Sequence, residues 1–264
     1  MSSDRSPLTI MTFNLRYASD DPPNSWRERR PVVGACLSLV EPDVIGTQEG
    51  LSRQIRDLEA DHPRYAVIGA GRDADGGGET LTVLYRRDRL TALESGHFWL
   101  SDSPEIAGSR SWGNTLPRMT TWVRFRDHVA DRDFSLVNTH LDHESAAARV
   151  RGAELICTRL ESFDPDTPVI VTGDFNAISR ADPTYDVFMA AGFTDLRFAV
   201  HDGSGPGYSS FHGYRPPATS GAHIDWILAR GIGSAQSFRL VDTHVNGQYP
   251  SDHFPLSVTL DLTG

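Results

Sequence analysis

Polar side chains that bind metal ions or move protons recur along this chain, each directly after a short apolar run. They are Asn14, Glu49, His140, Asp174 with Asn176, Asp225, and Asp252 with His253. In open α/β sheets the strand ends meet at one crevice, so residues far apart in sequence can form a single site. Carboxylate and amide oxygens suit hard divalent cations, while histidine and carboxylate groups suit proton transfer. The pattern predicts one site for metal-assisted or acid–base chemistry.

Each of these residues also has a simpler explanation when it is taken alone. Asn14 could cap a turn, and Glu49 could complement the dipole at the start of a helix. A single histidine such as His140 is more often a hydrogen-bonded core or surface residue, and Asp225 could be an ion-pair partner. The recurrence of such residues after successive strands, rather than any one of them, indicates a site.

The apolar patterning predicts an α/β domain that would bring these residues together. Strands are expected at residues 8–13, 43–47, 65–68, 81–85, 90–100, 119–125, 134–139, 168–171, 224–228 and 256–260. Helices are expected at residues 31–41, 51–58, 147–160 and 183–189. The strands at 81–85 and 90–100 are predicted to pair antiparallel around a turn at residues 87–89.

The loops between these elements show no sign of a domain boundary. Residues 101–117 form a long polar segment and residues 203–220 are rich in Gly, Pro and Ser, but strand patterns resume after both. A chain of 264 residues lies within the size range of one large α/β domain. We therefore expect residues 1–264 to form a single domain.

The basic residues exclude several classes of enzyme. All 25 of them are arginines, because the sequence contains no lysine. P-loop enzymes, Schiff-base enzymes and protein kinases each need a lysine at a reacting or phosphate-binding position, so these classes are excluded. The formal net charge of −10 opposes binding of a long polyanion. A small phosphorylated ligand is still compatible with it, since a local arginine cluster or a divalent cation inverts the field in a pocket.

The cysteines and the start of the chain favour a cytoplasmic protein. Cys36 and Cys157 form neither a disulfide framework nor a C-x-x-C metal motif. Residues 1–9 lack the pattern of a signal peptide, and no run approaches the roughly 18–20 apolar residues that span a bilayer. We expect a cytoplasmic protein without a membrane partner, and nothing indicates an obligate protein partner.

Six sequence blocks, spread over nearly the whole chain, are more specific than the single residues. They are Thr12–Arg16 (TFNLR), Gln48–Glu49 (QE), Asn138–Leu141 (NTHL), Gly173–Asn176 (GDFN), Ile224–Trp226 (IDW) and Ser251–Pro255 (SDHFP). In this order they resemble the signatures of the endonuclease/exonuclease/phosphatase superfamily. The resemblance implies a DNase I-like four-layer α/β sandwich, in which two packed mixed β-sheets are flanked by helices. It also implies hydrolysis of a phosphate ester that depends on Mg²⁺ or Mn²⁺.

The resemblance also implies roles for the residues of these blocks. Asn14, Glu49 and Asp252 would surround the metal, as one ion or two. Asp174 would orient the attacking water and accept its proton, and Asn176 would donate to the phosphate oxygens.

Two histidines complete the implied catalytic set. His253, held by Asp225 through its other ring nitrogen, would support the phosphate or supply a proton. His140 would contact the scissile phosphate from the other side. Glu79 resembles the acidic residue that holds the first histidine in this family, so it is paired with His140, although a carboxylate in this place is as often simply solvated.

Four further residues are predicted to bind substrate. Arg118 is the best candidate for a phosphate-clamping arginine, because a guanidinium fork matches phosphate geometry; a surface arginine stacked on a tryptophan is nearly as good an explanation. Asn138 and His143 accompany His140 in its block, and a solvated helix start explains His143 equally well. Trp112 could stack on a base or line a leaving-group pocket, although plain packing is commoner.

The substrate is less constrained than the chemistry. Short blocks at residues 71–72, 96–101, 111–112 and 138–143 resemble a bacterial branch of the superfamily whose members are mostly described only by family name. The acidic balance and the missing basic arm favour a small phosphorylated substrate, as a monoester or a diester. The alternative is a nuclease acting on DNA or RNA, and a binding module that has lost its chemistry ranks last, because every expected catalytic position is filled.

Overall fold

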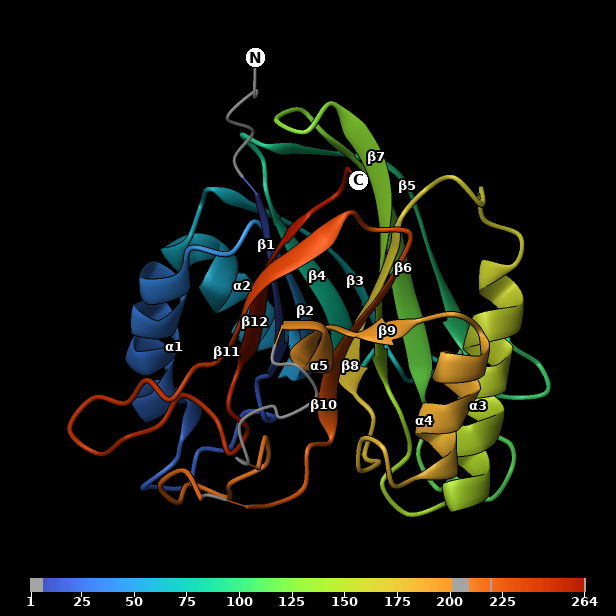
Figure 1. Ribbon diagram of the computed structural model, residues 1–264. Helices are drawn as coiled ribbons and strands as arrows, with labels where there is room; N and C mark the ends of the chain where they lie inside the picture. The colour runs from blue at the N-terminus through green and yellow to red at the C-terminus, as the bar shows by residue number, and fades with distance from the viewer. Residues whose placement is uncertain (1–6, 201–208, 219, 264) are drawn as a thin grey trace.

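Two six-stranded β-sheets form the centre of the molecule (Figure 1). The computed structural model describes residues 7–200, 209–218 and 220–263. The first sheet contains, in spatial order, β11 (Ser234–Leu240), β12 (Leu256–Asp261), β1 (Leu8–Asn14), β2 (Val44–Leu51), β4 (Glu79–Arg86) and β3 (Tyr65–Gly71). The second sheet contains β5 (Leu90–Trp99), β6 (Met119–Asp127), β7 (Arg132–His140), β8 (Val169–Asp174), β10 (Asp225–Arg230) and β9 (Thr194–Asp195). Both sheets mix parallel and antiparallel neighbours.

Helices cover the outer face of each sheet and give the molecule four layers (Figure 1). The helices α1 (Trp26–Val40) and α2 (Ser52–Asp61) bury their apolar sides on the first sheet. The helices α3 (Ala146–Leu160) and α4 (Pro183–Ala190) do the same on the second sheet, and α5 (Leu196–Val200) follows β9. The expected four-layer sandwich of two mixed sheets is therefore confirmed. None of the described helices is long and apolar enough to cross a membrane.

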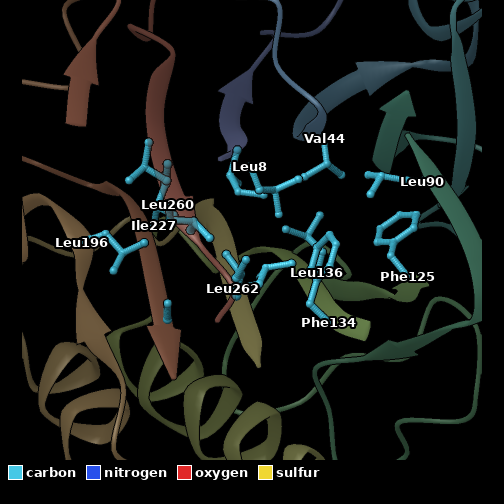
Figure 2. Packing of buried hydrophobic residues seen from close by; sticks show 14 of the residues in the cluster. Leu8, Val44, Leu90, Phe125, Phe134, Leu136, Leu196, Ile227, Leu260 and Leu262 are labelled. Carbon is cyan, nitrogen blue, oxygen red and sulfur yellow. The ribbon is translucent and has the colours of Figure 1, made fainter. Parts of the chain in front are cut away.

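An apolar core fills the space between the two sheets. Figure 2 shows Leu8 and Val44 from the first sheet facing Leu136 and Ile227 from the second. These residues come from the short β-branched and aliphatic runs that predict strands, and each is at most 1% exposed. Full burial of one such side chain contributes about 1.5–3 kcal/mol, so this layer holds the two sheets in a fixed relation. That relation matters because each sheet carries part of the site.

The first helix begins earlier than the sequence analysis predicts. It starts at Trp26, so Pro31 lies inside α1 rather than in its first turn. The cause is a capping box at Ser25 and Glu28, in which the Glu28 carboxylate accepts from the Ser25 backbone N–H at 3.0 Å. A capping box satisfies backbone donors at the helix start, and this outweighs the bond that the proline removes. The predicted start at residue 31 was wrong.

The predicted hairpin of residues 81–85 and 90–100 was also wrong. These strands are β4 and β5, and they belong to different sheets: β4 pairs with β2 and β3, whereas β5 pairs with β6. Arg89, in the connection between β4 and β5, is 6% exposed. It forms 2.8 Å ion pairs with Asp43, which directly precedes β2 of the first sheet, and with Asp127 at the end of β6 in the second sheet. A buried guanidinium with two carboxylate partners fixes a crossover that strand periodicity cannot distinguish from a hairpin turn.

Several segments were not anticipated at all, namely β9, α5 and β11. The strand β9 is only Thr194–Asp195, and β11 alternates weakly because much of it is exposed. In the predicted loop at residues 203–220, the described residues 209–218 and 220 form no helix or strand, while residues 203–208 and 219 lie outside the described residues.

The two sheets also meet through a buried polar contact that includes Asn138. Its side-chain oxygen accepts from Gln48 at 2.7 Å and its amide nitrogen donates to the Thr47 carbonyl at 2.8 Å. The same contact requires a glycine at position 46, since a Cβ on Gly46 would lie 2.2 Å from Thr172 Oγ1. Asn138 is fully buried, so the prediction that it binds substrate was wrong. Its hydrogen bonds join the sheets instead.

Candidate active site

The predicted site residues meet in a pocket where strands of both sheets end. The pocket has a volume of about 390 Å³. Nine of the predicted residues line it: Glu49, Glu79, Arg118, His140, His143, Asp174, Asn176, Asp252 and His253. Polar residues at strand ends predict such a crevice, and the structure brings these side chains together from six separate segments of the chain.

Strand pairing and local backbone kinks aim these side chains at the pocket. His140 at the end of β7 lies beside Asp174 at the end of β8, in a parallel pair. A bulge in β2 shifts its register at Glu49, whose φ is 61°. Asn176 has a φ of 49°. Left-handed backbone at a residue other than glycine costs stability and concentrates at functional sites, where it redirects side chains.

Asp174 lies at the centre of the site. One carboxylate oxygen accepts from the Asn14 amide at 2.9 Å and lies 3.5 Å from Nε2 of His140 and 3.8 Å from Nε2 of His253. The other oxygen accepts the backbone N–H of Asn176 at 3.0 Å. Asp174 is 2% exposed, and burial together with the nearby carboxylate of Asp225 raises the pKa of Asp174. A carboxylate with a raised pKa is suited to accepting a proton near neutral pH.

His253 is oriented by a buried carboxylate behind it. Its Nδ1 lies 2.9 Å from Asp225, which leaves Nε2 facing Asp174 and the pocket. Burial alone would lower the pKa of His253, but Asp225, Asp174 and Asp252 together raise it well above its usual value. The raised pKa favours the imidazolium form of His253, in which Nε2 carries a proton toward Asp174. The predicted pairing of His253 with Asp225 agrees with this geometry.

His140 has a different partner from the one predicted. Nη1 of Arg118 lies 3.1 Å from Nδ1 of His140. Because a guanidinium only donates, Nδ1 accepts from Arg118. A neutral ring then carries its proton on Nε2, which lies 3.5 Å from the Asp174 carboxylate and 3.1 Å from Nδ2 of Asn176. Burial and the charges of Arg118 and Arg72 lower the pKa of His140, so the ring is neutral. Glu79 instead pairs with Arg72 at 2.5 Å, and the predicted pairing of Glu79 with His140 was wrong.

Arg118 has a protein partner at each of its three nitrogens. Besides His140, it contacts Nδ1 of His143 at 2.8 Å and the carboxylate of Asp142 at 3.4 Å. Arg118 lines the pocket and is 4% exposed. Its contacts hold two histidines in place at the pocket wall, so the first role that the geometry gives it is positioning.

Asp174 belongs to a cluster of three potential metal ligands. Among the described residues, ligand atoms of Glu49, Asp174 and His253 lie within 4.8 Å of one another. Glu49 is common to this cluster and to the predicted ligand set. Two carboxylates at a polar pocket are the donors that Mg²⁺ or Mn²⁺ prefers, so the residues fit a hard divalent cation.

The other two predicted ligands have protein partners in the structure. The Asn14 oxygen accepts the backbone N–H of Arg16 at 2.9 Å, so its amide nitrogen faces Glu49 and Asp174, each at 2.9 Å. Asp252 lines the pocket and forms a 2.5 Å ion pair with Arg16. Asn14 therefore holds the two carboxylates together from behind, which is a positioning role that the sequence did not predict.

Trp112 lies outside the pocket. Its ring nitrogen donates to Asp102 at 2.9 Å, and its ring packs against the apolar cluster under α3. The prediction that Trp112 contacts substrate was therefore wrong, and plain packing explains this residue.

Sequence reasoning assigned no role to several residues that line the pocket. These are Arg16, Tyr17, Arg72, Leu116 and Ile224. Arg72 directly follows the end of β3, and a polar residue after a strand is the pattern that identified other site residues. The sequence analysis ended this strand at residue 68, because the Gly-rich residues that follow lack an apolar strand pattern. The exposed apolar side chains among them carry no chemical signal in a sequence.

Comparison with known proteins agrees with this geometry. The sequence profile of the Endonuclease/Exonuclease/phosphatase family matches residues 11–253. An endonuclease/exonuclease/phosphatase from Bacteroides vulgatus is 31% identical, with a TM-score of 0.89 over 97% of this chain and 99% of that chain. A mannosyl-6-phosphatase from Bacteroides thetaiotaomicron is 29% identical, with a TM-score of 0.86 over 95% of this chain and 98% of that chain.

A more distant relative acts on nucleic acid, according to its name. Tyrosyl-DNA phosphodiesterase 2 of Mus musculus is 24% identical over 98% of this chain and 67% of that protein. The family match includes the whole of the described site, from Asn14 to His253. The chain therefore belongs to the endonuclease/exonuclease/phosphatase family.

Proposed function

We propose that this protein is a divalent-metal-dependent phosphohydrolase that cleaves the phosphate ester of a small phosphorylated substrate. The observation that carries the proposal is the buried carboxylate of Asp174, which lies between Nε2 of His140 and Nε2 of His253 and beside Glu49. One pocket thus combines a base, two N–H donors and a carboxylate for a cation, which are the parts that hydrolysis of a phosphate ester needs.

The cation is assigned to carboxylates at the pocket wall. Glu49 would hold it beside Asp174, with water in the remaining positions, as Mg²⁺ or Mn²⁺ prefers. Asp252 would join it only by leaving its 2.5 Å ion pair with Arg16. Asn14 keeps Glu49 and Asp174 in place through its two 2.9 Å hydrogen bonds. A bound cation would supply positive charge for the phosphate oxygens.

The protein groups divide the proton transfers among them. Asp174 orients the attacking water and takes its proton, since its raised pKa suits a general base. His253, as an imidazolium backed by Asp225 at 2.9 Å, donates to the phosphoryl group or to the leaving oxygen. The neutral His140 donates from Nε2. Asn176 lines the same wall, and its amide nitrogen donates to the Leu141 carbonyl at 3.0 Å and lies 3.1 Å from Nε2 of His140, so its role is to position that ring.

The net charge and the residues that line the pocket support a small phosphorylated substrate. The formal net charge of −10 opposes a long nucleic acid, whereas arginines line the pocket itself. Tyr17, Leu116 and Phe211 are at least 37% exposed and also line it, so they offer an apolar wall to a leaving group such as a sugar. The mannosyl-6-phosphatase relative supports a small phosphorylated substrate, and tyrosyl-DNA phosphodiesterase 2 supports the alternative of a nuclease.

A substrate panel tests this proposal. Phosphate release would be measured with Mg²⁺ on hexose 6-phosphates, nucleotides and glycerol phosphates, and cleavage on single-stranded and duplex DNA and on short RNA. We expect turnover of one or more small esters, no cleavage of polymers, and loss of turnover in His253→Ala. His128→Ala, which changes an exposed histidine on the β6–β7 turn, is the matched control and should behave as wild type. Efficient cleavage of polymers with small esters untouched would establish the nuclease instead.

A further inference from the structure

Arg72 lines the pocket with a guanidinium group that is mostly unpaired. Arg72 is 9% exposed, and among the described residues its side chain hydrogen-bonds only to Glu79, through Nη1 at 2.5 Å. Its Nε is buried without a partner. A buried guanidinium loses its hydration, so unused donors at a pocket wall are costly unless an anionic ligand completes them.

The other two arginines of the pocket are engaged differently. Arg118 has a protein partner at each nitrogen, including His140 and His143. Arg16 is paired with Asp252 through Nη1, and its Nε is likewise buried without a partner, but its side chain is 32% exposed and lies over the rings of Tyr17 and Tyr214 at 5.5 and 5.4 Å. Arg72 and Arg16 thus each leave Nε without a partner, but the Arg72 side chain is more deeply buried, at 11% exposed against 32%.

The position of Arg72 places its charge beside the reacting groups. Arg72 lines the same pocket as His140 and Glu49, and its charge helps to lower the pKa of His140. Glu79 compensates the charge of Arg72 and holds its Nη1 at 2.5 Å. The remaining N–H donors of Arg72 are therefore already oriented, so a ligand that binds them loses little side-chain entropy. A guanidinium held in this way matches the paired oxygens of a phosphoryl group.

We infer that Arg72, anchored by Glu79, is the arginine that binds the phosphoryl oxygens of the substrate, and that Arg118 positions His140 and His143. This inference rests on the proposed function, because it takes the ligand of the pocket to be a phosphate ester. It replaces the sequence-based assignment of the phosphate clamp to Arg118. Glu79 thereby supports the phosphate site through Arg72 rather than through His140.

Binding of inorganic phosphate tests the inference without relying on turnover. Isothermal titration calorimetry at fixed Mg²⁺ would compare wild type with Arg72→Gln, Arg72→Lys and Arg118→Gln. A charge-assisted hydrogen bond contributes enough that Arg72→Gln should weaken phosphate binding by about tenfold or more, with Arg72→Lys in between. Arg118→Gln should change the dissociation constant by less than about threefold but lower kcat, because it misorients His140. Arg239→Gln, an exposed arginine on β11, is the matched control.

Two further variants separate binding from folding. Arg72→Gln leaves Glu79 buried without its partner, so the double variant Arg72→Gln/Glu79→Gln removes that charge and should still bind phosphate weakly. Glu79→Gln alone should keep or tighten phosphate binding, since the charge of Arg72 is then uncompensated. Wild-type affinity in the double variant, or a tenfold loss in Arg118→Gln, would overturn the inference while leaving the proposed function intact. A wild type that neither binds phosphate nor hydrolyses any ester would overturn both.

Discussion

At the residue scale, the site depends on two histidines held in opposite protonation states around one carboxylate. Asp225 keeps His253 charged, while Arg118 and burial keep His140 neutral. Both rings direct Nε2 toward Asp174, at 3.8 and 3.5 Å. The arrangement gives one charged and one neutral donor next to a base, which is how a pocket runs acid and base chemistry at the same pH.

Asp225→Asn tests the charged histidine. The amide cannot stabilise an imidazolium, so we expect kcat to fall by at least about tenfold with little change in KM, compared with roughly 10²- to 10⁴-fold for His253→Ala. Steady-state kinetics on the best small ester would measure both constants. Asp186→Asn, at an exposed position of α4, should leave them unchanged. Unaltered kcat in Asp225→Asn would show that the buried carboxylate does not support catalysis.

The sequence predicted which residues would form the site better than it predicted their partners. Asp225 with His253 followed from motif order, and Glu49, His140 and Asp174 line the pocket as expected. The partner of Glu79 could not be derived, because it depends on where β3 and β4 place Arg72. Such a pairing is a property of strand register across a Gly-rich turn, and no residue pattern encodes it.

At the element scale, periodicity located most strands and helices but could not assign strands to sheets. The strands β1, β2, β7 and β8 and the helices α3 and α4 lie where apolar spacing predicts them. The crossover between β4 and β5 was missed because its cause is long-range, namely the contacts of Arg89 with Asp43 and Asp127. Local patterns report which face of a strand is buried, but they do not report which neighbour buries it.

Asn138→Ala tests the polar contact between the sheets. It removes the shortest of the three hydrogen bonds of Gln48 and the donor to the Thr47 and Thr82 carbonyls, and a lost buried hydrogen bond costs about 1–3 kcal/mol. We expect the free energy of unfolding in urea to fall by about 3 kcal/mol, while KM for the best small ester stays close to wild type. Gln236→Ala, an exposed amide on β11, should cost under about 0.5 kcal/mol. A raised KM with wild-type stability would contradict this account and show that Asn138 binds substrate.

At the scale of the whole molecule, the site exists only because the two sheets pack together. Asn14 and Glu49 come from the first sheet, whereas His140, Asp174 and Asp225 come from the second (Figure 1). The apolar layer of Figure 2 fixes the distance between these two sets. The net charge of −10 disfavours long polyanions, whereas three arginines line the pocket and favour a short anionic ligand there.

The most direct test of the central claim is the Mg²⁺ dependence of phosphate release by wild type and by Asp174→Asn. This substitution keeps the shape of the side chain and removes the base, so turnover at saturating Mg²⁺ should fall by roughly 10²- to 10⁴-fold. A chelator should abolish wild-type turnover, and Asp166→Asn, at an exposed loop position, should match wild type throughout. Near-wild-type turnover in Asp174→Asn, or undiminished wild-type turnover with chelator present, would contradict the account.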